Sequence, residues 1–285
     1  MVKSGHMSEI RQMTFSPPGG AAVSVETMSF GRLRELDRGR SQRGDFFVVG
    51  LVADGIGSIV VDYRRFALGP RSVVWIGPGV VHQWMDISGL DGDIVLFTPT
   101  APVAPSARIL TSMPGIGTVL AVDAPDWSLI QSAAAHLRSE LAAELAAPGS
   151  PPEILGSLLS ALILRATPED QLAAARNDIF QRFRAAVETG LSSRHDVEFY
   201  AGLLGYSART LSRAARSTTG QSAKAYVSER VILEAKRLLA HEQCSLRETS
   251  SRLGFSDSSV FSAFFRRETG ITPGAWRDQV LGPDR

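Results

Sequence analysis

The chain has 285 residues, of which 44% are apolar, enough for about two globular domains with hydrophobic cores of their own. No apolar run has the length of a membrane-spanning helix, and the first residues lack the core of a signal peptide, so we expect a cytoplasmic protein with no membrane partner. Its single cysteine, Cys244, excludes an internal disulfide and agrees with a reducing compartment.

The formal net charge of +1 hides an uneven distribution of charge along the chain. Residues 176–285 carry 17 Lys and Arg against 12 Asp and Glu, whereas residues 1–175 carry 13 against 17. A basic module joined to an acidic one is typical of a nucleic-acid-binding domain attached to a domain that avoids nucleic acid. Ordinary scatter of charges could give the same balance, so this asymmetry only supports other evidence.

The first half of the chain is predicted to be a β domain that follows a flexible N-terminus at residues 1–19. Short runs of β-forming residues alternate with Gly, Asp and Pro, a pattern typical of a sandwich or small barrel. The clearest predicted strands are residues 46–52, 57–62, 73–76 and 94–97.

Two helices are predicted after a connection at residues 99–117, which is rich in Pro, Ala and Ser. Residues 127–147 have helical spacing with many Ala and Leu, and residues 153–166 carry a broad apolar stripe. Such a stripe usually indicates burial within the chain, and the alternative is a seam with a second copy of the protein.

After Pro168 the chain is predicted to be helical, and one pattern occurs twice. The first copy contains LGYS at residues 204–207 and the second LGFS at residues 253–256. In each, a helix leads to a Gly that permits positive φ and a Ser that can cap a second helix. This order is the signature of the helix-turn-helix, whose second helix enters the major groove of DNA. Two copies in one chain predict a DNA-binding regulator.

In the first copy, Asp196 is expected to cap a supporting helix, and the presented helix is expected to run from Ser207 to Gly220. Arg209 and Arg213 lie four residues apart on its exposed face, and a guanidinium matches the O6 and N7 acceptors of guanine. The candidate DNA-binding residues of this copy are Ser207, Arg209, Thr210, Arg213 and Arg216.

In the second copy, Ser245 and Glu248 fit a capping box, and Ser256 is expected to cap a presented helix over residues 257–269. Its exposed side chains are mostly short, and its arginines are expected to contact phosphate. The candidates here are Ser256, Ser258, Ser259, Ser262, Arg266 and Arg267. Residues 222–240 are predicted to form one long helix that holds the two copies at fixed spacing.

Residues 177–280 resemble the DNA-binding domain of AraC/XylS-family transcriptional regulators. The match is carried by Tyr200-Ala201, Leu204-Gly205, Ser207, Leu211-Ser212-Arg213, Gly220, Tyr226, Arg230, Ala235, Leu238-Leu239, Leu253-Gly254-Phe255, Phe261-Ser262, Phe264-Phe265-Arg266-Arg267, Gly270, Thr272-Pro273 and Trp276-Arg277. The resemblance implies promoter DNA and RNA polymerase as partners.

Three positions depart from the family pattern. Ala263 stands where the family often has an Arg, and Ala215 and Ala223 replace a usual Phe and Pro. Because Ala263 weakens base readout by the second copy, we expect sequence discrimination to depend chiefly on Arg209 and Arg213.

Residues 20–100 are similar to the cupin-like domains that family members often carry to bind an effector and to dimerise. The similarity depends mostly on residues 68–84, a strand, a Pro-Gly turn and a strand carrying a histidine. Two interpretations of His82 stay open: a hydrogen-bonded core residue, or a polar group in an effector cavity with Trp75 and Trp84.

Metal-dependent catalysis is not expected. A metal-binding cupin needs several clustered histidines with a carboxylate, and of the five histidines only His82 lies in the strand region. Asp91 and Asp93 are interpreted as solvated turn residues. We therefore expect no catalytic residues, no metal and no cofactor, and hence no enzyme.

The predicted fold class is α+β and multidomain. A cupin-like β-barrel with trailing helices occupies residues 20–172, and an all-α domain with two helix-turn-helix subdomains joined by a long helix occupies residues 173–285. The predicted function is a sequence-specific, homodimeric transcriptional regulator controlled by a small-molecule effector. The alternative is control by a protein partner with no small-molecule ligand.

Overall fold

The computed structural model describes residues 11–16, 24–37, 39–103, 106–111, 117–149, 151–168, 172, 177–240 and 244–281. The chain divides into two compact units, one within residues 8–172 and the other containing residues 173–285. Each unit has its own hydrophobic core.

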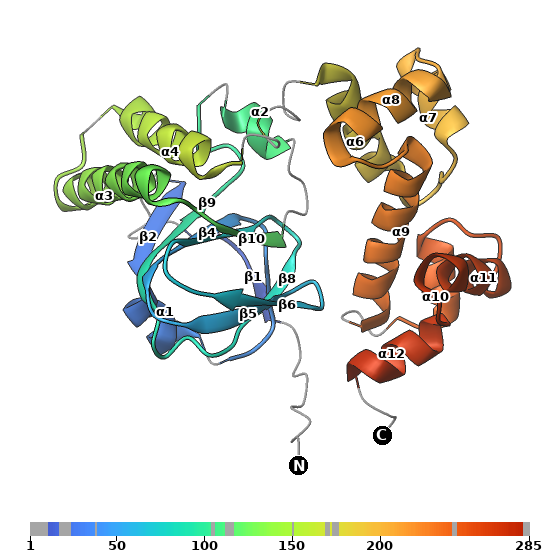
Figure 1. Ribbon diagram of the computed structural model, residues 1–285, viewed down its shortest axis with the longest axis horizontal. Coiled ribbons are helices and arrows are strands. Elements are labelled where there is room, and N and C mark those ends of the chain that lie inside the picture. The colour runs from blue at the N-terminus through green and yellow to red at the C-terminus, as the bar shows by residue number, and fades with distance from the viewer. Residues whose placement is uncertain are drawn as a thin grey trace. The chain divides into compact units, whose positions relative to one another are not determined.

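The first unit is built around two five-stranded sheets that face each other (Figure 1). The strand order in one sheet is β1 (Arg11–Met13), β3 (Gln42–Gly44), β8 (Val81–Trp84), β5 (Gly57–Val61) and β6 (Arg64–Leu68). In the other it is β10 (Gly117–Ala121), β7 (Ser72–Ile76), β4 (Phe47–Asp54), β9 (Asp91–Phe97) and β2 (Val25–Ser29). This rolled β architecture confirms the β domain with trailing helices that the sequence predicts.

Most neighbouring strands are antiparallel, but β1 pairs with β3 in parallel. Strand β1 lies inside the stretch expected to be a flexible N-terminus, of which only residues 11–16 are described. Backbone pairing with β3 orders it, and the Asp45 carboxylate accepts a hydrogen bond from the Phe15 amide at 3.0 Å. The β domain therefore begins before residue 20.

Two further details differ from the sequence interpretation. Asp91 and Asp93 do not lie in a turn, because they begin strand β9, and Asp93 forms an ion pair with Arg138. The connection at residues 99–117 contains a short helix, α2 (Ser106–Thr111).

The outer face of the second sheet is covered by helices. Helices α3 (Ala124–Ala146) and α4 (Pro152–Ala166) lie side by side along it (Figure 1). On β7, Val74 and Ile76 belong to the core between the sheets, and the alternation of side chains along a strand directs Trp75 to the other face. There the Trp75 indole nitrogen donates a hydrogen bond to the Ala166 carbonyl oxygen at 3.0 Å.

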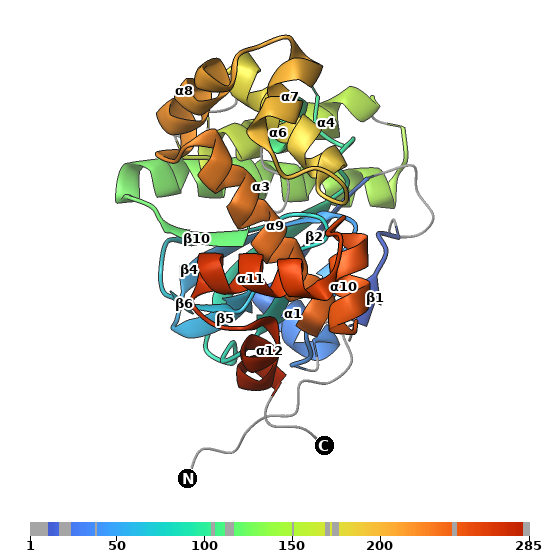
Figure 2. The same ribbon diagram turned by 90° about the vertical axis from the view of Figure 1, so that its right-hand side faces the viewer.

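The second unit is helical in all its described elements. It contains α6 (Asp178–Gly190), α7 (Val197–Leu204), α8 (Ala208–Thr219), α9 (Ala223–Ala240), α10 (Leu246–Arg252), α11 (Ser258–Thr269) and α12 (Pro273–Leu281). Helix α9 connects the group α6–α8 to the group α10–α12, and the two groups lie near its opposite ends (Figures 1 and 2). None of the described helices in either unit is long and apolar enough to span a bilayer.

Candidate DNA-binding interface and ligand cavity

The first helix-turn-helix follows the predicted local chemistry. The Asp196 carboxylate accepts a hydrogen bond from the Phe199 amide at 2.7 Å and starts α7. Gly205 then ends α7 with φ +70°, and Ser207 caps α8 through the Thr210 amide at 3.1 Å. Gly220 ends α8 in the left-handed region. The predicted caps and turn are therefore confirmed.

One face of α8 is buried and the other is free for contact. Leu211, Ala214 and Ala215 pack in the core of the first subdomain. Side chains on the opposite face lie in water: Ser207, Arg209, Arg213 and Arg216 are exposed and Thr210 is partly exposed. The guanidinium groups of these three arginines have no hydrogen-bond or ion-pair partner in the described part of the chain. The helix thus presents a row of uncompensated positive charge.

The second helix-turn-helix contains the predicted capping box at Ser245 and Glu248, which begins α10. Its α11 helix is capped differently from the prediction. Asp257, not Ser256, is the N-cap, because its carboxylate accepts from the Ser259 amide at 2.7 Å and from the Val260 amide at 2.9 Å. These hydrogen bonds lower the pKa of Asp257.

The predicted contact residues of the second copy lie on or next to α11. Ser256, Ser259 and Arg266 are exposed, and Ser258 and Ser262 are partly exposed. Arg267 is exposed too, but its guanidinium bonds the Glu268 carboxylate at 2.7 Å and lies 5.1 Å from the centre of the Phe264 ring. The accessible face of α11 therefore offers short hydroxyls and one uncompensated arginine.

The two subdomains touch each other directly as well as through α9. The loop between α6 and α7 carries His195, whose ring centre lies 4.6 Å from that of Phe255 in the second turn. His195 also stacks on Phe264 of α11, with 6.3 Å between ring centres. Its Nε2 lies 3.1 Å from the Leu191 carbonyl oxygen. This contact, which sequence reasoning missed, joins a supporting loop of one copy to the turn of the other.

An ion pair fixes α9 against the first subdomain. Arg230 of α9 contacts both carboxylate oxygens of Glu188 on α6, with Nε to Oε1 at 2.6 Å and Nη2 to Oε2 at 3.0 Å. Both side chains are largely buried. A bidentate pair in this setting restricts the direction in which α9 leaves the subdomain.

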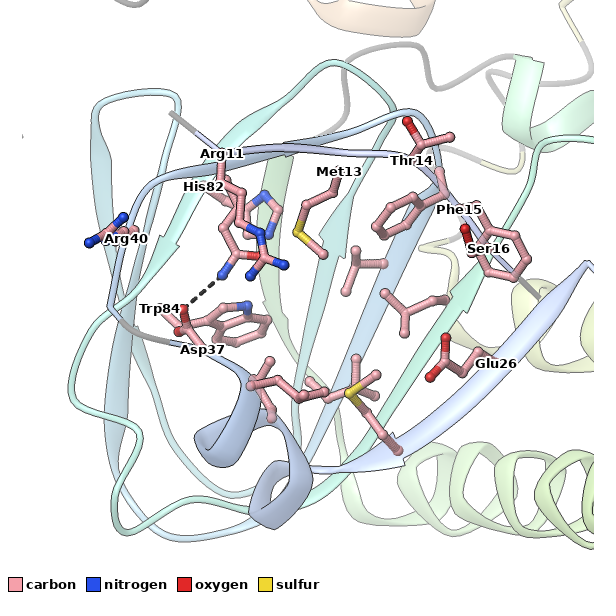
Figure 3. Close-up of a pocket in the computed structure, with 18 of the residues that line it drawn as sticks. Arg11, Met13, Thr14, Phe15, Ser16, Glu26, Asp37, Arg40, His82 and Trp84 are labelled. Atoms are coloured by element: carbon pink, nitrogen blue, oxygen red, sulfur yellow. Dashed lines mark hydrogen bonds between the residues drawn. The ribbon is translucent and has the colours of Figure 1, made fainter. Parts of the chain in front are cut away.

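The first unit contains a cavity of about 640 Å³ lined by residues of both sheets (Figure 3). His82 and Trp84 of β8 lie on the same inward face of their strand and line it. His82 is buried with its Nδ1 3.5 Å from the Val80 carbonyl oxygen, and burial lowers its pKa to about 4. The imidazole is therefore neutral at pH 7.

The predicted grouping of Trp75 with the other two residues is wrong. Trp75 is fully buried on the opposite face of the second sheet, where α4 accepts its hydrogen bond. Sequence reasoning also missed the charged residues of the cavity, which include Arg11, Glu26 and Asp37. No group of three or more histidines, cysteines or carboxylates suited to a metal ion occurs among the residues that the structure describes.

The second unit has the architecture of a double helix-turn-helix DNA-binding domain. Residues 200–279 match the family described as "Helix-turn-helix domain". Together with the relatives below, this match identifies the second unit as an AraC-type DNA-binding domain.

Two relatives are transcriptional activators named RhaR. The one from Cronobacter sakazakii is 30% identical over 115 residues, 40% of this chain and 41% of the relative. The one from Enterobacter sp. is 25% identical over 242 residues, 82% of this chain and 85% of the relative. The chain thus spans about two fifths of the first relative's length. Among solved structures, ToxT from Vibrio cholerae is similar over 91% of this chain and 99% of its own, with 12% identity and a TM-score of 0.41.

Proposed function

We propose that this protein is a sequence-specific transcriptional regulator that binds promoter DNA through α8 and α11 and responds to a small molecule bound in its N-terminal cavity. The observation that carries the proposal is the pair of capped helices, each braced by a supporting helix and each presenting a polar face. The role assigned to the protein is binding, with no chemical step.

The two presented helices are assigned different parts of recognition. Arg209 and Arg213 of α8 are the proposed base readers, because uncompensated guanidinium groups can bind guanine in bidentate fashion. Arg216, Arg266 and Arg267 are proposed to contact phosphate, which fixes register without reading sequence. The hydroxyl-bearing candidates, Ser207, Thr210, Ser256, Ser258, Ser259 and Ser262, are proposed as short-range contacts to backbone or base edges.

The spacing of the two copies supports binding to one face of a duplex. Helix α9 has 18 residues, which at 1.5 Å per residue is about 27 Å. Successive major-groove faces are about 34 Å apart, so two helices at the ends of such a rod suit neighbouring grooves.

Control by a small molecule is favoured over control by a partner protein because the cavity lies in the N-terminal unit and is large enough for a metabolite. RNA polymerase is the proposed target of regulation. A homodimer is proposed through α3 and α4, whose exposed apolar residues include Leu129, Leu145, Ile154 and Leu164. A regulator of this kind works in the cytoplasm, where promoter DNA is accessible.

The test is selection of binding sites by the full-length protein from a random DNA library, followed by titration of the selected site and a scrambled one. Arg213→Ala should reduce the ratio of the two affinities about 5- to 150-fold, the effect of losing about 1–3 kcal/mol of base discrimination. Arg182→Ala is the matched control, since Arg182 is an exposed arginine on α6 paired with Asp178. Failure to select any sequence would refute the proposed function, and an unchanged ratio for Arg213→Ala would remove its role in base reading.

A further inference from the structure

The cavity of the N-terminal unit has an apolar floor. Core residues from both sheets and from α1 (Phe30–Leu36) line it, including Leu33, Phe46, Val48, Ile94 and Leu96. A hydroxyl placed against such side chains would lose its hydrogen bonds to water without replacement. The floor therefore suits a ligand with a compact apolar body and disfavours a molecule covered with hydroxyl groups.

One carboxylate projects into this apolar space without a partner. Glu26 of β2 pairs across the sheet with Leu96 and lies on the same inward face as Met28 (Figure 3). It is half-buried, and it makes no hydrogen bond or ion pair within the described part of the chain. Burial raises the pKa of Glu26, which reflects the cost of holding this charge away from water.

A second carboxylate lies at another side of the cavity. Asp37 follows α1, and its Oδ1 accepts hydrogen bonds from the Gln42 side chain at 2.8 Å and from the Gly39 amide at 3.1 Å. Its other oxygen accepts no hydrogen bond from the residues that the structure describes and can bind a donor of the ligand. Burial raises the pKa of this carboxyl as well.

Among the described residues, the positive charges near the cavity lie in water and not buried beside these two carboxylates. Arg11 and Arg40 line the cavity but are exposed to water, and the charge of Arg11 acts on Asp37. Arg32, whose charge acts on Glu26, is exposed and paired with Glu35 at 2.5 Å. His82 is neutral at pH 7. Among the lining residues the carboxylates Glu26, Glu35 and Asp37 outnumber the arginines Arg11 and Arg40, so the cavity combines an apolar floor with a net negative charge.

We propose that the effector is an organic cation, a protonated amine on a small apolar or aromatic body, and that Glu26 is its principal charged contact. Asp37 offers a second acceptor to a ligand with further donors, and Trp84, which also lines the cavity, offers an indole face for the cation or for an aromatic ring. A protonated amine supplies hydrogen-bond donors and a positive charge as the partner of the Glu26 carboxylate, and the apolar body of the ligand covers the floor of the cavity. This inference rests on the proposed effector role of the cavity.

Calorimetric titration of the full-length protein with three probes that share a phenylethyl body tests the charge preference. We expect 2-phenylethylamine to bind at least about tenfold more tightly than 2-phenylethanol, and 3-phenylpropanoate to bind more weakly than either. Tighter binding of the carboxylate, or no binding by a panel of aryl and alkyl amines at millimolar concentration, would overturn the proposal.

Two variants locate the contact. Glu26→Gln should lose at least about tenfold in amine affinity and keep or raise the melting temperature, since it removes a poorly solvated charge. Glu140→Gln, which changes a half-buried carboxylate of α3 outside the cavity, should keep the wild-type affinity. Unchanged amine binding by a folded Glu26→Gln protein would refute the assignment, and Asp37→Asn provides the same comparison if Glu26→Gln does not fold. DNA-site selection is a separate readout, so a wrong ligand class leaves the DNA-binding result intact.

Discussion

The turn of the second helix-turn-helix gives the sharpest test of how the two subdomains are joined. Gly254 has φ +72°, and a Cβ built on it would lie 2.5 Å from the Ser192 carbonyl oxygen and 2.7 Å from the Ser193 Cα. Both atoms belong to the backbone of the α6–α7 loop, so neither can rotate away. Gly254→Ala must therefore displace the loop that carries His195.

The expected cost has two parts. An alanine in the left-handed region costs roughly 1–2 kcal/mol, and forcing a methyl group into a packed contact costs about 1–3 kcal/mol more. Gly220→Ala is the matched control, because Gly220 has φ +74° and nothing within 4 Å of its added Cβ. The difference between the two variants isolates the contact between subdomains at about 1–3 kcal/mol.

Urea unfolding of the full chain, followed by circular dichroism of the helical signal, measures this difference. Amide hydrogen exchange shows where the structure is loosened. Gly254→Ala should speed exchange in residues 191–196 and at the start of α11, and Gly220→Ala should leave exchange there unchanged. Equal losses of stability in the two variants, or exchange unchanged in that loop, would show that the contact contributes nothing to holding the subdomains together.

Two further results are expected. Glu188→Gln should lower the free energy of unfolding in urea by about 1–3 kcal/mol, because it leaves the largely buried Arg230 without its carboxylate. Asp178→Asn breaks an exposed pair and should cost no more than about 1 kcal/mol. Similar costs for the two variants would contradict the structural role of the buried pair. Burial lowers the pKa of His82 from 6.5 in the unfolded chain to about 4 in the folded one, so the unfolded state binds more protons between these two values. The free energy of unfolding should therefore fall as the pH drops from 6.5 toward 4. His82→Gln should flatten that slope and His136→Gln should retain it, and a slope that survives His82→Gln would refute the assignment.

The helix-turn-helix features were predictable because they depend on neighbouring residues. A glycine at a helix end and a capping side chain act within one turn of the chain, which is why Gly205, Gly220, Asp196 and the Ser245 cap agree with the sequence prediction. The one wrong cap arose where Ser256 and Asp257 stand side by side. Both residues can cap, and only the backbone conformation decides which one reaches the free amides.

The ligand cavity was less predictable because its walls come from distant segments. Whether Glu26 points inward depends on the pairing of β2 with β9, and the far wall depends on the parallel pairing of β1 with β3. Neither pairing can be predicted from the local pattern of residues. Trp75 was misplaced for a related reason: a strand buried on both faces has no polar alternation to show which side chains face the cavity.

The contact between subdomains matters because the two presented helices are chemically unequal. Helix α8 exposes three arginines that have no partner among the described residues, whereas α11 exposes mainly hydroxyls, and its Arg267 is already bonded to Glu268. On the proposed function, α11 supplies position more than sequence discrimination, and a positioning contact aids base reading only if α8 is held at a fixed distance and angle from it. Helix α9 can fix the distance between the two subdomains, but a single helix does not prevent one subdomain from rotating relative to the other about the helix axis. The stacking of His195 on Phe255 and Phe264 provides that restraint, because it connects the first subdomain to the turn and the presented helix of the second.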